Sequence, residues 1–284
     1  MLSVCVPGCS KGNSKKENKE EKTVRHYFGE DTEYKRDGTP HKYVVLSFDD
    51  GITQDKKLID ILNKYNITAS FNINTGLFGE SWDWVAEVQG NGKDFPHLRW
   101  TEEEIKTGIY DGMDICSHGF QHASCVNESA ENIINDVKRD AEKIEEIFGK
   151  YPRGFAYPGG SCDSHAIEVI TENTDIRYAR TINSTRSFNL PKYFMEWNPT
   201  CDIVAEDASL FLKNFLKKEL KDKDLLLYGW SHAYELDIYE NWDKFEKFIK
   251  ELGEARDRGD VIVLTDAEFY ELFKDEIPSI REKE

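Results

Sequence analysis

Residues 44 to 55 read VVLSFDDGITQD, an apolar run that ends in two adjacent carboxylates and a glycine. Such a run predicts a buried strand that closes on Asp49 and Asp50. Taken alone, the DDG is typical of a turn, because Asp and Gly favour turn conformations. A further role for the two aspartates therefore depends on which residues stand at the ends of the other strands.

Short β-type runs alternate with amphipathic helical stretches from about residue 41 to residue 275. This alternation predicts an α/β fold in which βα units build a parallel sheet. The predicted strands are 43–48, 68–73, 113–116, 154–157, 177–182, 225–229 and 261–264.

The helices between these strands carry apolar side chains at a 3.6-residue spacing, which predicts one core-facing side on each helix. One such stripe is Ile133, Val137, Ala141, Ile144 and Phe148, and another is Trp242, Phe245, Phe248, Ile249 and Leu252. Thr101 and Glu104 have the spacing of a capping box that begins a further helix. Residues 76–98 and 183–201 are predicted as long loops whose aromatic side chains form either sugar platforms or lids over the core.

The composition indicates a soluble globular protein. Hydrophobic residues make up 39% of the 284 residues, and no apolar run approaches the roughly 18 residues that span a bilayer. The net charge of −17 repels nucleic acid phosphates and anionic lipid surfaces. A neutral glycan would not feel this repulsion. We therefore expect no nucleic acid partner, and we separately expect a monomer.

The first residues, MLSVCVPGCSKGNSKKENKEEK, form a short apolar start followed by a highly charged tract. Val6-Pro7-Gly8-Cys9 resembles a bacterial lipobox, which predicts a lipid anchor at Cys9 and an extracytoplasmic, membrane-anchored lipoprotein. The apolar segment is shorter than the roughly 7 to 15 residues of a signal h-region, so a disordered tail on a cytoplasmic protein is the alternative. Either way, residues 1–38 are predicted as tail and linker and residues 39–284 as the folded domain.

Polar side chains follow the predicted strands at their carboxyl ends, where the loops of a parallel barrel converge on one face. They are Asp49 and Asp50; Asn72 and Asn74; His118 and His122; Pro158, Gly159 and Gly160; Arg180; and Trp230, Ser231 and His232. Each is a weak signal alone, but their joint occurrence at successive strand ends indicates a functional site.

A metal centre accounts for this combination, because one carboxylate and two imidazoles leave coordination positions open for water and substrate. If residues 118–122 turn helically, His118 and His122 project from one face about one turn apart. Adjacent strand residues face opposite ways, so Asp49 and Asp50 need not compete for one ion. The sequence thus predicts that one aspartate binds metal while the other handles protons.

Four motifs in order resemble those of the polysaccharide deacetylase family, the carbohydrate esterases of family 4 that share the NodB homology domain. SFDDG at 47–51 is similar to the first motif, SHGFQH at 117–122 to the second and FAYPGG at 155–160 to the third. GWSHAYE at 229–235 is similar to the last, histidine-bearing motif. The resemblance spans residues 43–266, nearly the whole folded part.

The resemblance implies a distorted (β/α)7-type barrel with fewer than eight strands. By matching positions, Asp50, His118 and His122 would hold a divalent metal ion, with zinc foremost and cobalt, nickel or manganese as the other candidates. The implied activity is hydrolytic removal of acetyl groups from a polysaccharide by a metal-bound water. The bond cleaved would be the amide of an N-acetylated sugar, as in cell-wall glycans, or an acetyl ester.

The same resemblance assigns roles to the remaining strand-end residues. Asp49 would be the catalytic base and His232 the catalytic acid, and the backbone N–H of Gly159 would help to bind the oxyanion. Three aromatic side chains would line a substrate pocket: Tyr157, Trp197 and Trp230.

The chain departs from the family pattern in three places. Ala156 replaces the third-motif arginine that orients the base carboxylate, and Arg180 and Arg153 are the candidate substitutes. Gly119 stands where a hydroxyl residue usually follows the first metal histidine. The fourth motif, which supports the acid histidine, is matched only loosely, by Glu196-Trp197 or by Cys201-Asp202.

The missing arginine leaves open a second class, a catalytically idle relative that binds glycan without turnover. Asp49 and His232 argue against this reading, since binding alone needs neither a base nor an acid. A glycosidase is disfavoured because its two carboxyls lie roughly 5 Å or more apart on separate strands. No GxSxG elbow of a serine esterase occurs in the chain.

Overall fold

The computed structural model describes residues 38–90, 93 and 95–281. The predicted N-terminal tail, with Cys9, therefore lies outside the described residues except for Gly38. Within the described part, no helix has the length and apolar character needed to cross a membrane.

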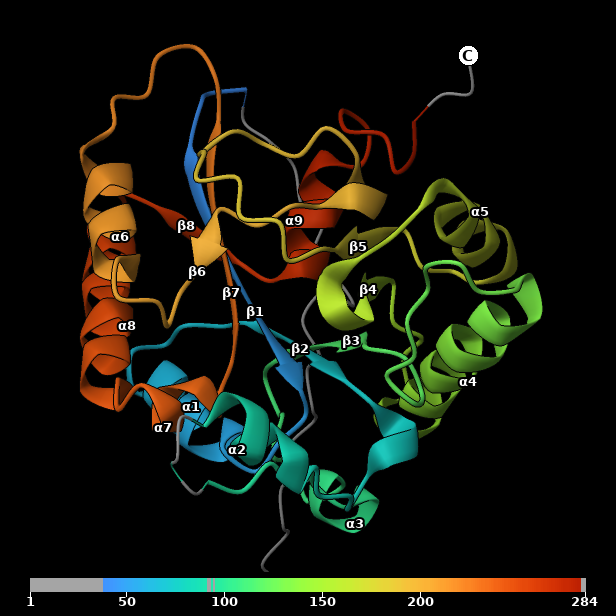
Figure 1. Cartoon of the computed structure of the whole chain (residues 1–284). Coiled ribbons are helices and arrows are strands. Elements are labelled where there is room, and N and C mark those ends of the chain that lie inside the picture. The colour runs from blue at the N-terminus through green and yellow to red at the C-terminus, as the bar shows by residue number, and fades with distance from the viewer. Residues whose placement is uncertain (1–37, 91–92, 94, 282–284) are drawn as a thin grey trace, which may run out of the picture.

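The strands form one parallel sheet that curls around the centre of the molecule, with helices packed outside it (Figure 1). Its order is β5-β4-β3-β2-β1-β7-β6, with β8 paired to β1. The strands are β1 (Lys42–Asp50), β2 (Ser70–Ile73), β3 (Asp114–Ser117), β4 (Gly154–Ala156), β5 (Tyr178–Arg180), β6 (Cys201–Asp202), β7 (Leu225–His232) and β8 (Ile262–Leu264). The predicted distorted parallel barrel is confirmed. The seven predicted strands are all present, and the two-residue β6 is an additional strand that the sequence did not predict. The described residues thus form eight strands, whereas the resemblance implied fewer than eight.

The barrel closes through the segment that leads into β6. The backbone of Trp197 pairs with β5, since its N–H donates to the carbonyl of Ala179 and its carbonyl accepts from Thr181. A few residues later, Cys201 and Asp202 pair with β7. One short segment thus links the two ends of the sheet.

β1 lies at the centre of the sheet and is buried along its whole length. Its side chains alternate between two sides, because successive residues of a strand face opposite ways. Val44, Leu46 and Phe48 pack against the helical layer, whereas Tyr43 and Val45 belong to a separate core cluster. A strand covered on both faces reads as a continuous apolar run, which is why the opening stretch is so hydrophobic.

The helices that cover the sheet are α1 (Asp55–Lys64), α2 (Asp83–Gln89), α3 (Glu102–Ile105), α4 (Ala130–Phe148), α5 (Ser164–Asn173), α6 (Ala208–Lys217), α7 (Glu235–Ile238), α8 (Trp242–Asp257) and α9 (Asp266–Phe273). Short 3-10 turns are η1 (Thr75–Leu77), η2 (Pro158–Gly160) and η3 (Phe194–Glu196). The first predicted long loop therefore contains α2, and the second contains η3. The predicted capping box is present at the start of α3.

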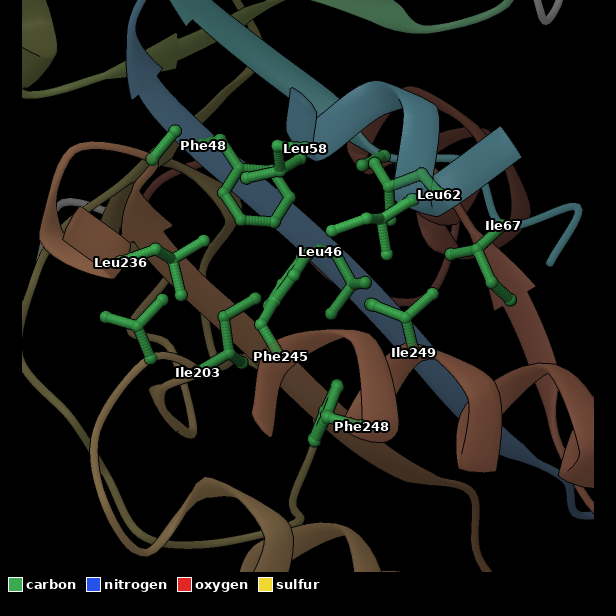
Figure 2. Close-up of a cluster of buried hydrophobic side chains, with 14 of the residues drawn as sticks. Leu46, Phe48, Leu58, Leu62, Ile67, Ile203, Leu236, Phe245, Phe248 and Ile249 are labelled. Carbon is green, nitrogen blue, oxygen red and sulfur yellow. The ribbon is translucent and has the colours of Figure 1, made fainter. Parts of the chain in front are cut away.

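The apolar stripe of α8 packs directly onto β1 (Figure 2). Phe245 meets Phe48 edge to face at a centroid distance of 6.1 Å, and Phe248 and Ile249 belong to the same core cluster, as the 3.6-residue spacing predicts. Truncating one of these phenylalanines to alanine would cost about 3–5 kcal/mol through lost burial and the cavity left behind. This packing holds β1 rigid, and with it the two aspartates at its end.

Candidate active site

Asp49 occupies the inner side of the barrel at the carboxyl end of β1. Its strand partners are Asn72 on β2 and His232 on β7, so the register alone brings three polar residues side by side. The Asn72 side-chain amide donates to Oδ1 of Asp49 at 2.8 Å. Nε2 of His232 lies 3.9 Å from Oδ2 of Asp49.

The Asp49 carboxylate is held by Arg180. Nη2 of Arg180 donates to both carboxylate oxygens, and both side chains are only 2% exposed. Burial alone would raise the pKa of Asp49, but the charges of Arg180, His118 and His232 lower it below its ordinary value. Asp49 is therefore ionised and fixed in orientation.

Arg180 is also the strand partner of Ala156. The two residues pair in the register of β4 and β5, so they lie side by side and face the same way. The guanidinium missing at Ala156 is thus supplied from the next strand. The other candidate, Arg153, instead pairs with Glu271 at 2.6 Å and takes no part in the site.

Asp50 does not face away from Asp49, as alternation along a strand predicted. Its φ is +82°, a left-handed conformation that is uncommon outside glycine and frequent at functional sites. Nε2 of His118 consequently lies 3.9 Å from Asp49 Oδ2 and 3.9 Å from Asp50 Oδ1. The prediction of opposite faces was wrong, and the two carboxylates differ instead in their partners.

The partners of Asp50 are two residues that the sequence pattern did not indicate. Nε2 of the buried His97 lies 3.0 Å from Oδ2 of Asp50, and Nη2 of Arg99 lies 3.5 Å from Oδ1. Both come from the long segment between β2 and α3, where no strand end marked them. Their contacts orient the Asp50 carboxylate so that Oδ1 faces the two other histidines.

Asp50, His118 and His122 form a compact group of metal-ligand type. Oδ1 of Asp50 lies 3.9 Å from Nε2 of His118 and 3.8 Å from Nε2 of His122. One donor atom from each residue falls within 4.8 Å of the others. An ion with bonds of about 2.0–2.2 Å can bridge donor pairs up to about 4.4 Å apart, so the spacing of Asp50 to each histidine fits.

The protonation states of these three residues also suit a cation. Burial would raise the pKa of Asp50, but the His97 hydrogen bond and the nearby positive charges hold it well below its ordinary value. Burial lowers the pKa of His118, and it lowers that of His122 to about 3. Nδ1 of His118 bonds to the Ala156 carbonyl at 2.7 Å, which fixes the ring and leaves Nε2 for an ion.

Residues 118–122 do not form the predicted helical turn. His122 has a φ of +54°, and the two imidazole rings meet edge to face with centroids 4.7 Å apart. Gly119 also has a positive φ of +77°, and a Cβ there would lie 2.2 Å from Oδ2 of Asp136. The positive φ, together with the close approach of the Asp136 side chain, favours glycine over a hydroxyl residue at this position.

Two aspartates of α4 anchor this histidine loop, and neither stood out in the sequence. Asp140 accepts from the Ser117 hydroxyl at 2.6 Å and from the backbone N–H of His118 at 3.2 Å. Asp136 accepts from the backbone N–H of Gln121 at 2.7 Å. Both adjoin the apolar stripe of the helix, where a carboxylate indicates a buried hydrogen-bond role.

His232 lies between the Asp49 carboxylate and Glu235. Its Nδ1 is 3.4 Å from Oε2 of Glu235, so Nε2 is the atom turned toward Asp49. Burial would lower the pKa of His232, but the charge of Glu235 and the two aspartates raise it to about 10. Asp202 accepts a hydrogen bond from Ser231 at 2.9 Å, which places it on the same network. Of the two loose fourth-motif matches, Cys201-Asp202 is the one that joins the network of His232, through Ser231 and Glu235.

The remaining predicted residues divide between the site and the core. Trp230 lies at the site, with its ring 4.8 Å from the Arg180 guanidinium and 5.5 Å from the His232 ring. Gly159 is exposed after β4, and its φ of +66° suits glycine. Tyr157 and Trp197 are buried in core clusters, so neither ring offers surface to a sugar.

Comparison with known proteins bears on this arrangement. The polysaccharide deacetylase family model matches residues 36–179, just over half of the chain. Among curated proteins, a sequence search finds no significant match.

Two solved structures are similar over most of the chain. One is the Xyl-CE4 domain of a multidomain xylanase from the hindgut metagenome of Trinervitermes trinervoides, at 18% identity and a TM-score of 0.51, covering 86% of this chain and 96% of that one. The other is a family 4 acetyl xylan esterase from Clostridium thermocellum in complex with a cobalt ion, at 16% identity and a TM-score of 0.51, covering 84% and 93%. Both support the fold, and together with the family match they show that the chain belongs to the polysaccharide deacetylase family.

Proposed function

We propose that this chain hydrolyses acetyl groups from a polysaccharide with the help of one divalent metal ion. Asp50, His118 and His122 would hold the ion. When bound, it would supply Lewis acidity to the acyl carbonyl and to the attacking water. Zinc is the first candidate, and cobalt, nickel and manganese suit the same donor set.

The protons are handled by Asp49 and His232. Asp49 is ionised and fixed by Arg180 and Asn72, so it can accept a proton from the attacking water. His232 carries a proton at neutral pH because its pKa is raised, and it would donate that proton to the departing amine or alcohol. The backbone N–H of Gly159 would stabilise the oxyanion that forms between these steps.

The observation that carries this proposal is the division of partners between the two aspartates. Arg180 binds both oxygens of Asp49, which lies 3.9 Å from His232. Asp50 instead has His97 and Arg99 as its hydrogen-bond partners and lies within 4 Å of both His118 and His122. A protein that only bound glycan would need neither arrangement. The absence of the motif arginine at position 156 favoured an idle protein. That argument is weaker now, because Arg180 contacts Asp49 from the neighbouring strand.

Acetate release from a panel of acetylated glycans tests the proposal. The panel contains N-acetylated chitooligosaccharides, peptidoglycan and O-acetylated xylan, each with zinc, cobalt, nickel or manganese. We expect release from at least one N-acetylated glycan, which would assign the amide bond, while release from xylan would assign the ester. A protein that binds metal and glycan but releases no acetate from any of them would support the idle alternative.

The pH dependence of kcat/KM should depend on Glu235, whose carboxylate lies beside Nδ1 of the proposed acid His232. Since its negative charge raises the pKa of His232, the substitution Glu235→Gln should lower that pKa. The alkaline limb of kcat/KM should therefore move to lower pH, by at least about one unit. Rates measured from pH 5 to 11 check this, with Glu196→Gln as the control because Glu196 pairs with Arg281 instead. An unmoved alkaline limb would remove His232 from the role of acid.

A further inference from the structure

A pair of tryptophans lies beside the proposed metal site on the segment that follows β2. Trp82 immediately precedes α2, and its backbone N–H donates to the backbone carbonyl of His97 at 2.9 Å. Ser81 pairs with Leu98 in the same antiparallel contact. This contact fixes the start of α2 to the segment that carries His97 and Arg99. Figure 1 shows α2 next to the carboxyl end of β1, where the two aspartates lie.

The rings make a continuous series of contacts from the site outward. The Trp82 ring meets the His122 ring edge to face at a centroid distance of 5.3 Å. The Arg99 guanidinium lies 4.0 Å from the Trp82 ring, and the His97 ring stacks parallel to it at a centroid distance of 5.9 Å. These contacts hold the Trp82 ring in place and cover part of it. Trp84 follows at 5.6 Å from Trp82. The series therefore begins at a proposed metal ligand and ends at the surface.

The outer end of this series is apolar and open. Trp84 is 50% exposed and Val88, one turn further along the same face of α2, is 72% exposed. Val85 is buried and anchors the helix from its other side. An indole with half of its surface in water does not contribute fully to the core, and a group of exposed apolar side chains marks a contact surface.

We propose that Trp84, which is held by Trp82, forms a stacking platform for a sugar ring that neighbours the reacting residue of a glycan chain. The proposal rests on the proposed function, since it places the acetylated sugar at the metal site and a neighbouring sugar on Trp84. The flat face of a pyranose carries C–H groups that pack on an indole, while its hydroxyls stay in water.

The surrounding charge selects the type of glycan. Glu80, Asp83 and Glu87 are exposed and lie within four residues of Trp84 in the sequence, and the whole chain carries a net charge of −17. Carboxylates at this position repel a uronic acid or phosphate-bearing polymer. The platform therefore fits a neutral pyranose chain, or one that carries amines where acetyl groups have already been removed.

Binding of oligosaccharides to full-length variants tests the platform by calorimetry. The probes are N-acetylated chitotetraose and O-acetylated xylotetraose, with N-acetylglucosamine as a single sugar. Trp84→Ala should weaken binding of at least one tetramer about tenfold, since the loss of aromatic stacking is worth about that factor. Trp84→Phe should keep affinity within about twofold of the original, and binding of the single sugar should not change. Leu210→Ala, an exposed apolar residue on α6, serves as the matched control.

Two results would overturn the platform. One is unchanged tetramer binding in Trp84→Ala. The other is no tetramer binding by the original chain, together with a dimer in sedimentation that Trp84→Ala dissociates, which would make this face a contact between copies. Acetate release is measured separately: release with unchanged binding in Trp84→Ala refutes the platform alone. Binding that depends on Trp84 without any release refutes the proposed function alone.

Discussion

Replacing Arg180 by alanine should reduce kcat at least about a hundredfold, and adding Ala156→Arg to that variant should restore much of the loss. The first effect arises because Asp49 would lose the donor to both of its oxygens, and a misplaced catalytic group costs about that factor. The second arises because the two positions are strand partners that face the same way. Initial rates of acetate release for the single and double variants measure both effects.

The free energy of unfolding of the same single and double variants is the control for moving the arginine from position 180 to position 156. Both members of the Asp49 and Arg180 pair are 2% exposed, so removing one leaves a buried charge and should cost about 3–5 kcal/mol. Ala156→Arg alone should also destabilise, because it forces a second guanidinium into a fully packed place. In the double variant the two losses should largely cancel. Additive losses in stability and rate would show that position 156 cannot present an arginine to Asp49.

Asp49→Asn should reduce acetate release by about 100- to 10,000-fold, because an amide cannot accept the proton from the attacking water. Metal affinity should stay within about tenfold, since the three proposed ligands are unchanged. Asparagine nevertheless leaves Arg180 buried without its counter-charge, so the variant should also be less stable, by about 3–5 kcal/mol. Rates, metal titration and thermal unfolding of the same preparation check these three effects.

A second substitution separates the chemical loss from the structural one. Arg180→Met in the Asp49→Asn chain removes the stranded charge, so most of the stability should return while the rate stays low. Recovery of acetate release in this double variant would exclude Asp49 as the base.

Residues at strand ends could be predicted because parallel strands deliver their carboxyl ends to one face. Asp49, Asp50, His118 and His232 each follow a strand with a clear apolar pattern, and the structure brings them together. The geometry within the site could not be predicted from the sequence in the same way. A positive φ at Asp50 reverses the alternation of the strand, and no residue pattern signals it.

The sequence also did not predict side-chain contacts that depend on packing between distant segments. Arg180 reaches Asp49 because β4 and β5 pair in one particular register, and the sequence could name it only as one of two candidates. His97 lies in a stretch without periodicity, so nothing connected it to Asp50. The family resemblance assigned Trp197 to the substrate pocket, but its backbone pairs with β5 and its ring fills the core.

The most direct test of the metal-dependent mechanism is to remove metal from the protein with a chelator and to add it back while acetate release is measured. We expect the chelated protein to be inactive and one equivalent of zinc, cobalt, nickel or manganese per chain to restore release. We also expect His118→Ala to abolish both the binding of that equivalent and the recovery. Full acetate release by the chelated protein, or undiminished recovery in His118→Ala, would contradict the proposed metal centre.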